Sequence, residues 1–339
     1  MEKVPVAEAV GMILCQDITK IVPGEFKGRA FKKGHVIREE DVEVLLSLGK
    51  ENIYVWAPEA GDIHENDAAL RLSKCITGSN IYFEDPYEGK CTLISQLKGL
   101  FKVNSSLLYK INSVDSVSIA SLPNNFPVEK GRKLAGARVI PLVVEEEKVI
   151  HAEKLCREHG PVFEVKPYKK LKAGIITTGS EVYKGRIKDK FGPVMKDKIA
   201  SFDGDFLGQV LCPDDLDQIN QGIQDFVSRG AEMIILTGGM SVDPDDLTPG
   251  AIKKSGANII TYGVPAQPGN MFLLAYLGKT VLMGVPGCAM FCRTTVLDVV
   301  LPRLFAGEEL IKDDFIKMGE GGFCSSCEEC SYPNCYFGR

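Results

Sequence analysis

Glycines occur in three short segments of the second half of the sequence, and in two of these segments hydroxyl and carboxylate side chains lie beside them. These segments are Thr177–Glu181, Thr237–Asp246 and Val285–Cys288, and each follows an apolar run of strand length. Glycine lets backbone N–H groups approach an anion closely, and neighbouring hydroxyls add hydrogen-bond donors. The segments therefore predict a site that binds a phosphate or a similar anion without a large basic patch. The alternative is that all three are plain tight turns.

Carboxylates accompany these glycines at Glu181, Asp189, Asp243, Asp245 and Asp246. Two carboxylates about 4 Å apart repel each other by on the order of 4 kcal/mol at an effective dielectric constant of ~20. A cation is needed to offset this repulsion at an anion site. Mg²⁺ commonly bridges one or two carboxylates and substrate phosphate oxygens, so we predict Mg²⁺ here. The alternative is that these acids are solvated loop residues that cap the next helix.

Four of the eleven cysteines lie close together near the end of the sequence. Their C-x₂-C-x₂-C-x₄-C spacing is close to that of ferredoxin cysteines, with one extra residue before the last. The spacing predicts a [4Fe–4S] cluster, and Zn²⁺ in a Cys₄ site is the alternative. A third interpretation is a mobile tail without metal, entered through the glycine-rich residues 319–322. The predicted ligands are Cys324, Cys327, Cys330 and Cys335.

Other catalytic patterns do not occur in the sequence. There is no G-x-x-x-x-G-K-[ST], no G-x-G-x-x-G after a strand, no calcium loop and no His-Glu-x-x-His. Only four histidines occur, all in the first half, which disfavours a His-based triad. Cys288 and Cys292, four residues apart, are expected to be small core residues, and a redox or cofactor role is the alternative.

The elements around the three glycine segments predict their position in the fold. Beyond residue 170, apolar runs of strand length alternate with helical stretches, which indicates an α/β domain with a doubly wound, mostly parallel sheet. Ligands bind beyond the carboxyl ends of the strands in such sheets. Thr248 is the expected N-cap of a helix beginning at Pro249. Strands are expected over Ala173–Thr177, Met233–Leu236 and Val281–Val285, and helices over Val194–Phe202, Leu216–Val227 and Ala289–Leu304.

The first half predicts a mixed α+β region. Helices are expected over Glu39–Leu48 and from Asn66 onward, and strands over Ser106–Ile111 and Ser116–Ala120. Residues 151–170 have prolines, a glycine, lysines and no strong periodicity, so we place a boundary there. The predicted domains are residues 1–168 (mixed α+β), 169–310 (α/β) and 311–339 (Cys-rich tail).

Composition narrows the class of protein. The chain has 339 residues, of which 45% are hydrophobic and 25% charged, as in ordinary globular proteins. A net charge of −5 disfavours nucleic acid as a partner, because its binding needs clustered lysine and arginine. The first fifteen residues have charges and no sustained apolar stretch, so we expect neither a secretory signal nor a membrane span. Together with cysteines that form no disulfide framework, this predicts a cytoplasmic protein.

Residues 170–310 resemble the molybdopterin-binding domain shared by molybdopterin molybdenumtransferases, molybdopterin adenylyltransferases and the competence-damage-inducible family. The first half resembles the front of the molybdenumtransferases through Val4-x-x-Ala7-x-x-x-Gly11, Asp17-Ile18 and residues 128–142. In the second half the resemblance rests on Thr178–Glu181, Gly185-x-Ile187-x-Asp189, Gly238-Gly239-x-Ser241, Asp246-x-Thr248-Pro249 and Val285–Gly287.

The resemblance implies a role in molybdenum-cofactor biosynthesis. Molybdopterin, or its adenylylated form, would bind with Mg²⁺ and receive molybdate, with release of AMP. Glu181, Asp189 and Asp246 would be the catalytic residues. The resemblance also implies a homodimer in which the N-terminal part of one subunit approaches the cofactor domain of the other. The cofactor-binding residues implied are Thr178, Gly179, Ser180, Gly238, Gly239, Ser241, Asp243, Pro286 and Gly287.

Three departures from the molybdenumtransferase pattern bear on its function. An acidic N-terminal segment of the family is replaced by Phe26–Phe31, and Ser180 stands where the family's Thr-Gly-Asp-Glu turn has Asp. Fewer than thirty residues follow residue 310, too few for the family's small C-terminal β-domain. An alternative function is therefore a non-catalytic molybdopterin carrier or a maturation chaperone for a client molybdoenzyme. A nucleotide pyrophosphatase of the competence-damage type is a third.

Overall fold

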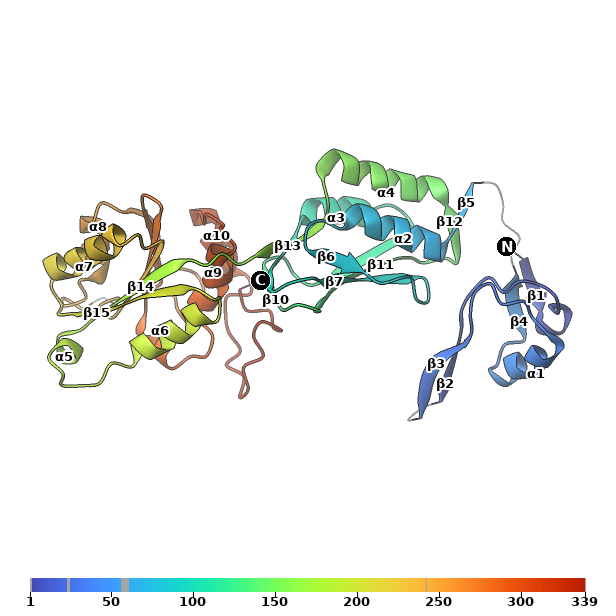
Figure 1. Ribbon diagram of the computed structural model, residues 1–339, viewed down its shortest axis with the longest axis horizontal. Coiled ribbons are helices and arrows are strands. Elements are labelled where there is room, and N and C mark those ends of the chain that lie inside the picture. Colours follow the sequence, from blue (N-terminus) through green and yellow to red (C-terminus); the bar gives the residue numbers. More distant parts are fainter. Residues whose placement is uncertain (1, 23–24, 56–60, 242, 339) are drawn as a thin grey trace. The chain divides into compact units, whose positions relative to one another are not determined.

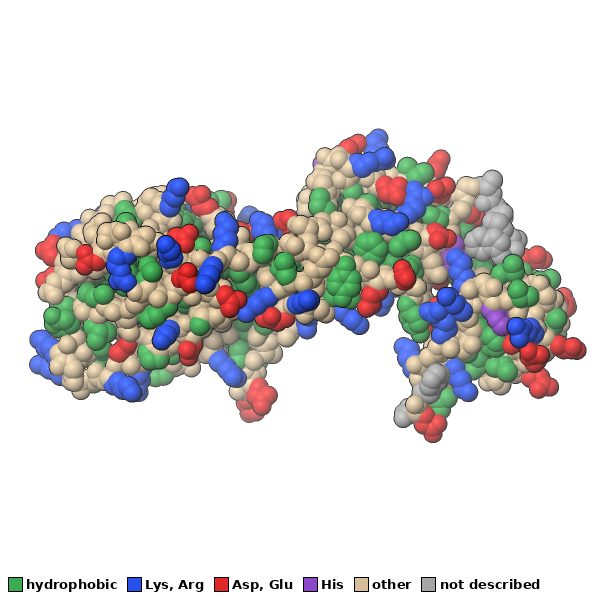
Figure 2. Space-filling view, in the orientation of Figure 1, with side chains coloured by type: hydrophobic (Ala, Val, Ile, Leu, Met, Phe, Trp, Pro, Cys, Tyr) green, Lys and Arg blue, Asp and Glu red, His purple; other side chains and the backbone are tan. Residues whose placement is uncertain are grey.

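The computed structural model describes residues 2–22, 25–55, 61–241 and 243–338. The chain divides into two compact units. The first unit comprises Met1–Gln96, Val103–Leu122 and Lys130–Glu164, and the second comprises Leu97–Lys102, Pro123–Glu129 and Val165–Arg339. On the face drawn in Figure 2, acidic and basic side chains are interspersed over the surface of each unit.

The second unit contains a six-stranded sheet with the order β15-β14-β16-β19-β18-β17 (Figure 1). The first four of these strands are parallel, and β17 and β18 are antiparallel to their neighbours. This confirms the predicted α/β class with a mostly parallel sheet. The strands are β14 (Lys172–Thr178), β15 (Asp205–Cys212), β16 (Met233–Thr237), β17 (Asn258–Tyr262), β18 (Leu273–Leu277) and β19 (Thr280–Val285).

Helices cover both faces of this sheet because successive strand residues point to opposite sides. Ile175 and Ile235 pack with α6 (Phe191–Ala200), α9 (Val296–Phe305) and α10 (Lys312–Ile316). Their neighbours Ile176 and Ile234 pack on the other face with α7 (Leu216–Ser228) and α8 (Thr248–Lys254). The predicted strands and the helices α6 and α7 are confirmed. A four-residue helix, α5 (Ser180–Tyr183), follows β14.

Two predictions about helix starts in this unit were wrong. The last long helix does not begin at Ala289: residues Gly287–Met290 form a 3₁₀ turn, η2, and α9 begins at Val296. Thr295 and Asp298 form a capping box that fixes this start. Thr248 is not an N-cap but the first residue of α8, and its hydroxyl donates to the carbonyl oxygen of Gly238 instead.

Residues 97–102 and 123–129 are distant in sequence from the six-stranded sheet and yet belong to the second unit. They supply most of β8 (Gly99–Val103) and β10 (Phe126–Val128), which form a three-stranded sheet with β13 (Phe163–Pro167). The chain ends with a 3₁₀ turn, η3 (Lys317–Gly319), and an irregular tail.

The first unit is mixed α+β, as predicted. Its core sheet has the order β6-β7-β11-β9, and three two-stranded sheets pair β1 with β4, β2 with β3 and β5 with β12. The elements are β1 (Glu2–Pro5), η1 (Val6–Glu8), β2 (Ile18–Val22), β3 (Phe26–Phe31), α1 (Glu39–Ser47), β4 (Asn52–Val55), β5 (Asp62–His64), α2 (Glu65–Ile76), β6 (Ile81–Phe83), β7 (Lys90–Ser95), α3 (Ser105–Asn112), β9 (Val117–Ser121), β11 (Lys133–Val139), β12 (Val143–Glu145) and α4 (Glu146–His159).

Two sequence expectations for this unit were wrong. The predicted strand over Ser106–Ile111 is the helix α3, whose start is capped by the side chain of Asn104. The supposedly aperiodic residues from 151 onward continue α4, which buries Val149, Ala152 and Cys156 on one face. The helices α1 and α2 and the strand β9 occur where expected. In the part of the chain that the structure describes, no helix is long and apolar enough to cross a membrane.

Candidate functional site

A cavity of about 960 Å³ lies at the carboxyl ends of the parallel strands of the second unit. We call it the rim cavity. Thr177 pairs with Thr237, and Thr237 pairs with Val285, so β14, β16 and β19 end at the same edge. The segments after β14 and β16, and the η2 turn with Phe291 after β19, all line the cavity. Two of the three glycine segments thus meet at one site, whereas the third, Val285–Cys288, ends at the same edge of the sheet but does not line the cavity.

A buried hydroxyl network shapes the floor of the rim cavity. The Thr248 hydroxyl donates to the carbonyl oxygen of Gly238 over 2.8 Å, and it lies 3.2 Å from the hydroxyl of Thr178. Gly238 has φ = 86°, and a Cβ there would lie 2.3 Å from the Thr178 carbonyl oxygen. Gly239 follows with φ = 55°. At position 238 only glycine adopts the positive φ without strain and also leaves room for the end of β14, with which a side chain would clash.

The turn after β14 is held by contacts that the sequence did not reveal. The Ser180 N–H donates to the carboxylate of Asp214 over 2.8 Å, and the Gly179 N–H donates to the Cys212 carbonyl oxygen over 3.2 Å. Asp214 lines the rim cavity. The amide that we expected to bind phosphate at Ser180 therefore already binds an internal carboxylate. A phosphate at this position has to displace Asp214.

Asp189 combines a structural role with a position in the rim cavity. Its Oδ1 accepts the N–H of Phe191 at 2.9 Å, and both of its carboxylate oxygens lie within 3.2 Å of the Gly192 nitrogen, at the start of α6. Gln209 on β15 donates to its Oδ2 over 2.6 Å and also to the Thr177 hydroxyl over 2.9 Å. These contacts fix the carboxylate at the edge of the cavity.

The acidic segment after β16 is a turn that folds on itself. The Asp243 N–H donates to the Asp246 carboxylate over 3.0 Å, and the Asp246 N–H donates to the Asp243 carbonyl oxygen over 2.9 Å. Tyr262 donates to the carbonyl oxygen of Ser241 over 3.3 Å. Partial burial raises the pKa of Tyr262, and the nearby Asp246 raises it further, so this hydroxyl stays protonated as a donor.

Carboxylates outnumber cations around the rim cavity. Its lining contains six carboxylates and two ammonium groups. Among the described residues, no set of three or more His, Cys, Asp or Glu side chains is arranged to hold a metal ion. Exposed carboxylate oxygens such as those of Asp243 and Asp245 are the donors that Mg²⁺ prefers, and one or two of them suffice when ligand phosphate completes the shell. The donor set therefore fits Mg²⁺ bound together with a phosphorylated ligand.

The rim cavity contains most of the predicted site residues, but not all of them. The predicted residues that line it are Thr178, Gly179, Ser180, Glu181, Asp189, Gly238, Gly239, Asp243 and Asp246. Ser241, Pro286 and Gly287 are not among the lining residues. The lining also includes residues that were not predicted from the sequence, among them Asp214, Lys188, Lys190, Met290 and Phe291. Lys188 and Lys190 flank Asp189, and their proximity to the Gly185-x-Ile187-x-Asp189 pattern was the available signal.

Residues 174–306 match a family model described as "Probable molybdopterin binding domain". This part of the chain belongs to the molybdopterin-binding domain family. The match confirms the resemblance inferred from the three glycine segments. We refer to it below as the molybdopterin-family domain. Residues 3–57 match a different family model, described only as a domain of unknown function.

Curated relatives share parts of this domain. The molybdopterin molybdenumtransferase of Synechococcus elongatus is 26% identical over 153 residues, which is 42% of this chain and 38% of that enzyme. A CinA-like protein of Mycolicibacterium vanbaalenii is 36% identical over 78 residues, 23% of this chain and 18% of that protein. The chain thus spans well under half the length of these relatives.

Solved structures with similarity to the chain include two proteins of molybdopterin biosynthesis. The molybdopterin biosynthesis moea protein of Pyrococcus horikosii has a TM-score of 0.36 and 14% identity over 90% of this chain and 74% of its own. The molybdopterin biosynthesis enzyme MoaB of Thermus thermophilus has a TM-score of 0.33 and 19% identity over 41% of this chain and 98% of its own.

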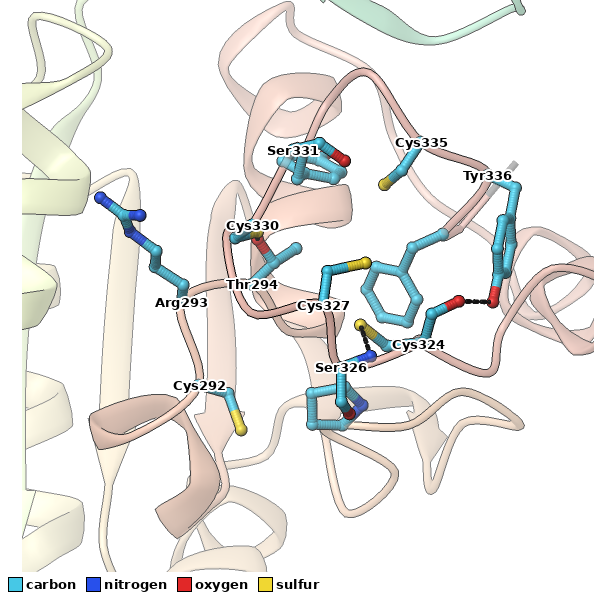
Figure 3. A pocket seen from close by; sticks show the side chains of 14 residues that line it. Cys292, Arg293, Thr294, Cys324, Ser326, Cys327, Cys330, Ser331, Cys335 and Tyr336 are labelled. Atoms are coloured by element: carbon cyan, nitrogen blue, oxygen red, sulfur yellow. Dashed lines mark hydrogen bonds between the residues drawn. The ribbon is translucent and has the colours of Figure 1, made fainter.

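A second cavity of about 260 Å³ lies between the molybdopterin-family domain and the tail that follows it in the same unit. We call it the cysteine cavity. Cys324, Cys327, Cys330 and Cys335 all line it, together with Cys292 (Figure 3). Cys292 is therefore not the core residue that we expected. Its neighbour Cys288 is partly buried, which raises the pKa of that thiol, as does the nearby Cys292.

Proposed function

We propose that the rim cavity binds molybdopterin, free or adenylylated, and that the chain transfers molybdate onto it with release of AMP. The observation that carries this proposal is the meeting of two glycine segments, those after β14 and β16, with six carboxylates around one cavity of the molybdopterin-family domain. A role in molybdenum-cofactor biosynthesis follows from the family. The transfer step, the metal ion and the homodimer are our proposals.

The residues of the cavity divide into those that bind and those that position. Gly238 and Gly239 bring backbone close to the ligand, and the Thr178 and Thr248 hydroxyls hold that backbone in place. Lys188 and Lys190 supply positive charge for a phosphate. Asp189 holds the start of α6 while presenting a carboxylate at the cavity edge.

Mg²⁺ would bind one or two of the carboxylates of Glu181, Asp243 and Asp246 together with phosphate oxygens, whose negative charge it would neutralise. The excess of carboxylates over ammonium groups supports a bound divalent ion, because an anionic ligand would otherwise be repelled. Ser180 in place of the family's acidic residue leaves one negative charge fewer in the turn after β14.

The decisive experiment incubates the full chain with adenylylated molybdopterin, molybdate and Mg²⁺ and measures AMP. We expect AMP release that requires molybdate and falls at least about 100-fold in Glu181→Gln and Asp246→Asn, the range over which a positioned charge acts in catalysis. Glu309→Gln, an exposed residue away from the cavity, is the matched control.

Two other outcomes point to the alternative functions. Tight molybdopterin binding with no AMP in any condition makes the chain a carrier or a maturation chaperone for a molybdoenzyme. Hydrolysis of dinucleotides without molybdate makes it a pyrophosphatase. The relatives named CinA-like are the reason for including that assay.

The four tail cysteines remain our predicted metal ligands, for a [4Fe–4S] cluster or for Zn²⁺. Their common position around one cavity supports this prediction. No described group of three or more ligand side chains already has metal-binding geometry, so binding requires the thiols to adjust.

A further inference from the structure

The cysteine-rich tail is anchored to the second unit at both of its ends. The Gln267 N–H donates to the Gly322 carbonyl oxygen over 2.7 Å, and the Cys324 N–H donates to the Gln267 carbonyl oxygen over 2.9 Å. At the other end the Gly338 N–H donates to the Gly321 carbonyl oxygen over 3.0 Å, and Phe337 is only 2% exposed. The cysteines thus lie on a closed loop rather than on a free end.

Side chains also tie this loop to the start of α9. The Tyr332 hydroxyl donates to the Asp298 carbonyl oxygen over 2.9 Å. The Thr294 hydroxyl lies 3.1 Å from the sulfur of Cys330. Asp298 in turn accepts the Thr295 N–H in the capping box of α9. The loop therefore contacts the segment that joins η2 to α9.

The lining of the cysteine cavity contains the four thiols that a [4Fe–4S] cluster requires. The sulfur atoms of Cys324, Cys327 and Cys335 face a common space (Figure 3), and the cavity volume is about 260 Å³. A single Zn²⁺ binds four sulfurs at about 2.3 Å, commonly from two C-x₂-C pairs separated by a longer loop. Here the first three thiols have the C-x₂-C-x₂-C spacing of ferredoxin ligands, which favours the cluster. Phe337 and Tyr332 at the lining would shield the cluster from water.

The cysteine cavity and the rim cavity share one short segment of chain. Met290 and Phe291 line the rim cavity, and the next three residues, Cys292 to Thr294, line the cysteine cavity. Phe291 is 80% exposed, so its ring is accessible to a ligand in the rim cavity. A shift of this segment on one side therefore moves residues on the other.

We propose that the cysteine cavity holds a [4Fe–4S] cluster on Cys324, Cys327, Cys330 and Cys335, and that the segment Met290–Thr294 couples cluster loading to ligand binding in the rim cavity. The coupling rests on the proposed function, whereas the cluster does not. Loading would hold the Cys330 sulfur beside the Thr294 hydroxyl and so restrict the movement of Met290 and Phe291, the residues that a pterin would contact.

The cluster is tested by anaerobic reconstitution of the full chain with ferrous iron and sulfide, followed by desalting and assay of both. We expect one cluster per chain, a broad absorbance near 400 nm typical of such clusters, and loss of at least half of the bound iron in Cys327→Ser and Cys335→Ser. Cys292 lines the same cavity but is not a proposed ligand, so Cys292→Ser is expected to retain the iron. Cys75→Ser, in the first unit, controls for non-specific binding. Absence of iron uptake, or uptake of one Zn²⁺ per chain in its place, overturns the proposal.

The coupling is tested by anaerobic calorimetry with molybdopterin on loaded and metal-free chain. We expect the loaded chain to bind at least about fivefold more tightly, the lower end of usual coupling between sites. Thr294→Val, which removes the hydroxyl beside Cys330, should retain the cluster and reduce this ratio. Equal affinities overturn the coupling. If no form binds molybdopterin, the proposed function and the coupling both fail, while the iron assay still decides the cluster.

Discussion

The Thr248 hydroxyl donates to the carbonyl oxygen of Gly238 over 2.8 Å, and this contact ties the start of α8 to the segment after β16. Thr248 is fully buried. No water can replace the donor if it is removed, so the Gly238 carbonyl would lose a buried hydrogen bond. Leaving a buried acceptor without a partner costs about 1–3 kcal/mol.

We therefore expect Thr248→Val to lower the free energy of unfolding by about 1–3 kcal/mol and to weaken molybdopterin binding, because the Gly238–Gly239 backbone is no longer held. Thr248→Ser keeps the hydroxyl and should lose only about 1 kcal/mol through its missing methyl group. Urea unfolding and calorimetry measure the two effects. Equal losses in both variants would show that volume matters here and the hydrogen bond does not.

Gly238 is expected to be intolerant of a methyl group. Its φ of 86° costs an L-residue roughly 1–2 kcal/mol, and the added Cβ would lie 2.3 Å from the Thr178 carbonyl oxygen. Gly256 is a matched control, since its φ is 84° and nothing lies within 4 Å of its Cβ position. Gly238→Ala should destabilise the chain by a further 1–3 kcal/mol, roughly the cost of overpacking, relative to Gly256→Ala. Similar stabilities for the two variants would contradict this close approach.

The position of the glycine segments at one edge of the sheet was predictable because it depends on a general property of parallel sheets. Val281–Val285, Ala173–Thr177 and Met233–Leu236 are continuous apolar runs, as strands covered on both faces must be. Their carboxyl ends necessarily share one edge. Asp214 was not predicted because the strand before it, β15, is not a continuous apolar run. This strand lies at the edge of the sheet and has exposed residues such as Phe206 and Leu211.

Other errors had two causes, a short pattern that fits both a helix and a strand, and contacts between residues far apart in sequence. The helix α3 has Leu107, Leu108 and Ile111 on its buried side, a pattern too short to exclude a strand, and the cap at Asn104 decides its start. The closed tail could not be predicted either. Its anchor is the pairing of Gly322 and Cys324 with Gln267, which no local pattern in the sequence encodes.

Asp189 allows its charge to be separated from its structural role. Asn at this position retains an oxygen that accepts the Phe191 N–H, and Asn caps helices about as well as Asp. Asn would place an NH₂ group opposite the Gln209 amide, which donates to Oδ2, so Gln209 has to turn its oxygen toward it. We expect Asp189→Asn to keep most of the stability of the chain but to reduce Mg²⁺-dependent molybdopterin binding. Asp189→Ala should in addition lose about 1 kcal/mol of stability. Calorimetry measures this binding. If Asp189→Asn binds molybdopterin as tightly as the unmodified chain in the presence of Mg²⁺, the Asp189 carboxylate is not part of the binding site.

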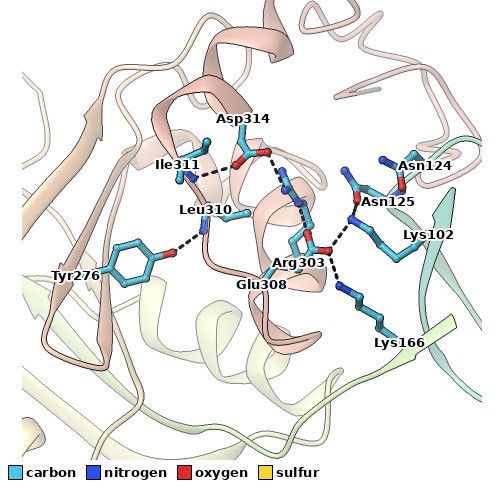
Figure 4. Close-up of polar contacts among 10 residues, drawn as sticks. All are labelled: Lys102, Asn124, Asn125, Lys166, Tyr276, Arg303, Glu308, Leu310, Ile311 and Asp314. Atoms are coloured by element: carbon cyan, nitrogen blue, oxygen red, sulfur yellow. Dashed lines mark hydrogen bonds and ion pairs between the residues drawn. The ribbon is translucent and has the colours of Figure 1, made fainter. Parts of the chain in front are cut away.

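Glu308 lies in a network of ion pairs that joins distant segments of the second unit (Figure 4). Arg303 donates to it over 2.8 Å, and Lys102 and Lys166 lie 2.5 and 3.3 Å from its other oxygen. Burial by itself would raise its pKa, but the hydrogen bonds from Lys102 and Arg303 outweigh burial and hold the pKa at about 2. Burial of Lys102 lowers the pKa of that amine, so the pair stabilises the fold by less than the shift of Glu308 alone implies.

Because the pKa of Glu308 is lower in the folded chain than the ordinary value of 4.5, its contribution is complete above that pH. It is lost progressively as the pH falls from about 4.5 to about 2. Glu308→Gln should lower the free energy of unfolding at pH 7 by about 1.5–3 kcal/mol, the usual effect of hydrogen bonds to a charged group. It should also flatten the acid dependence in this range. The exposed neighbour Glu309→Gln should match the unmodified chain at every pH. Urea unfolding at pH 7 and at pH 3.5 tests this, and an acid dependence unchanged by Glu308→Gln would assign the low pKa to some other carboxylate.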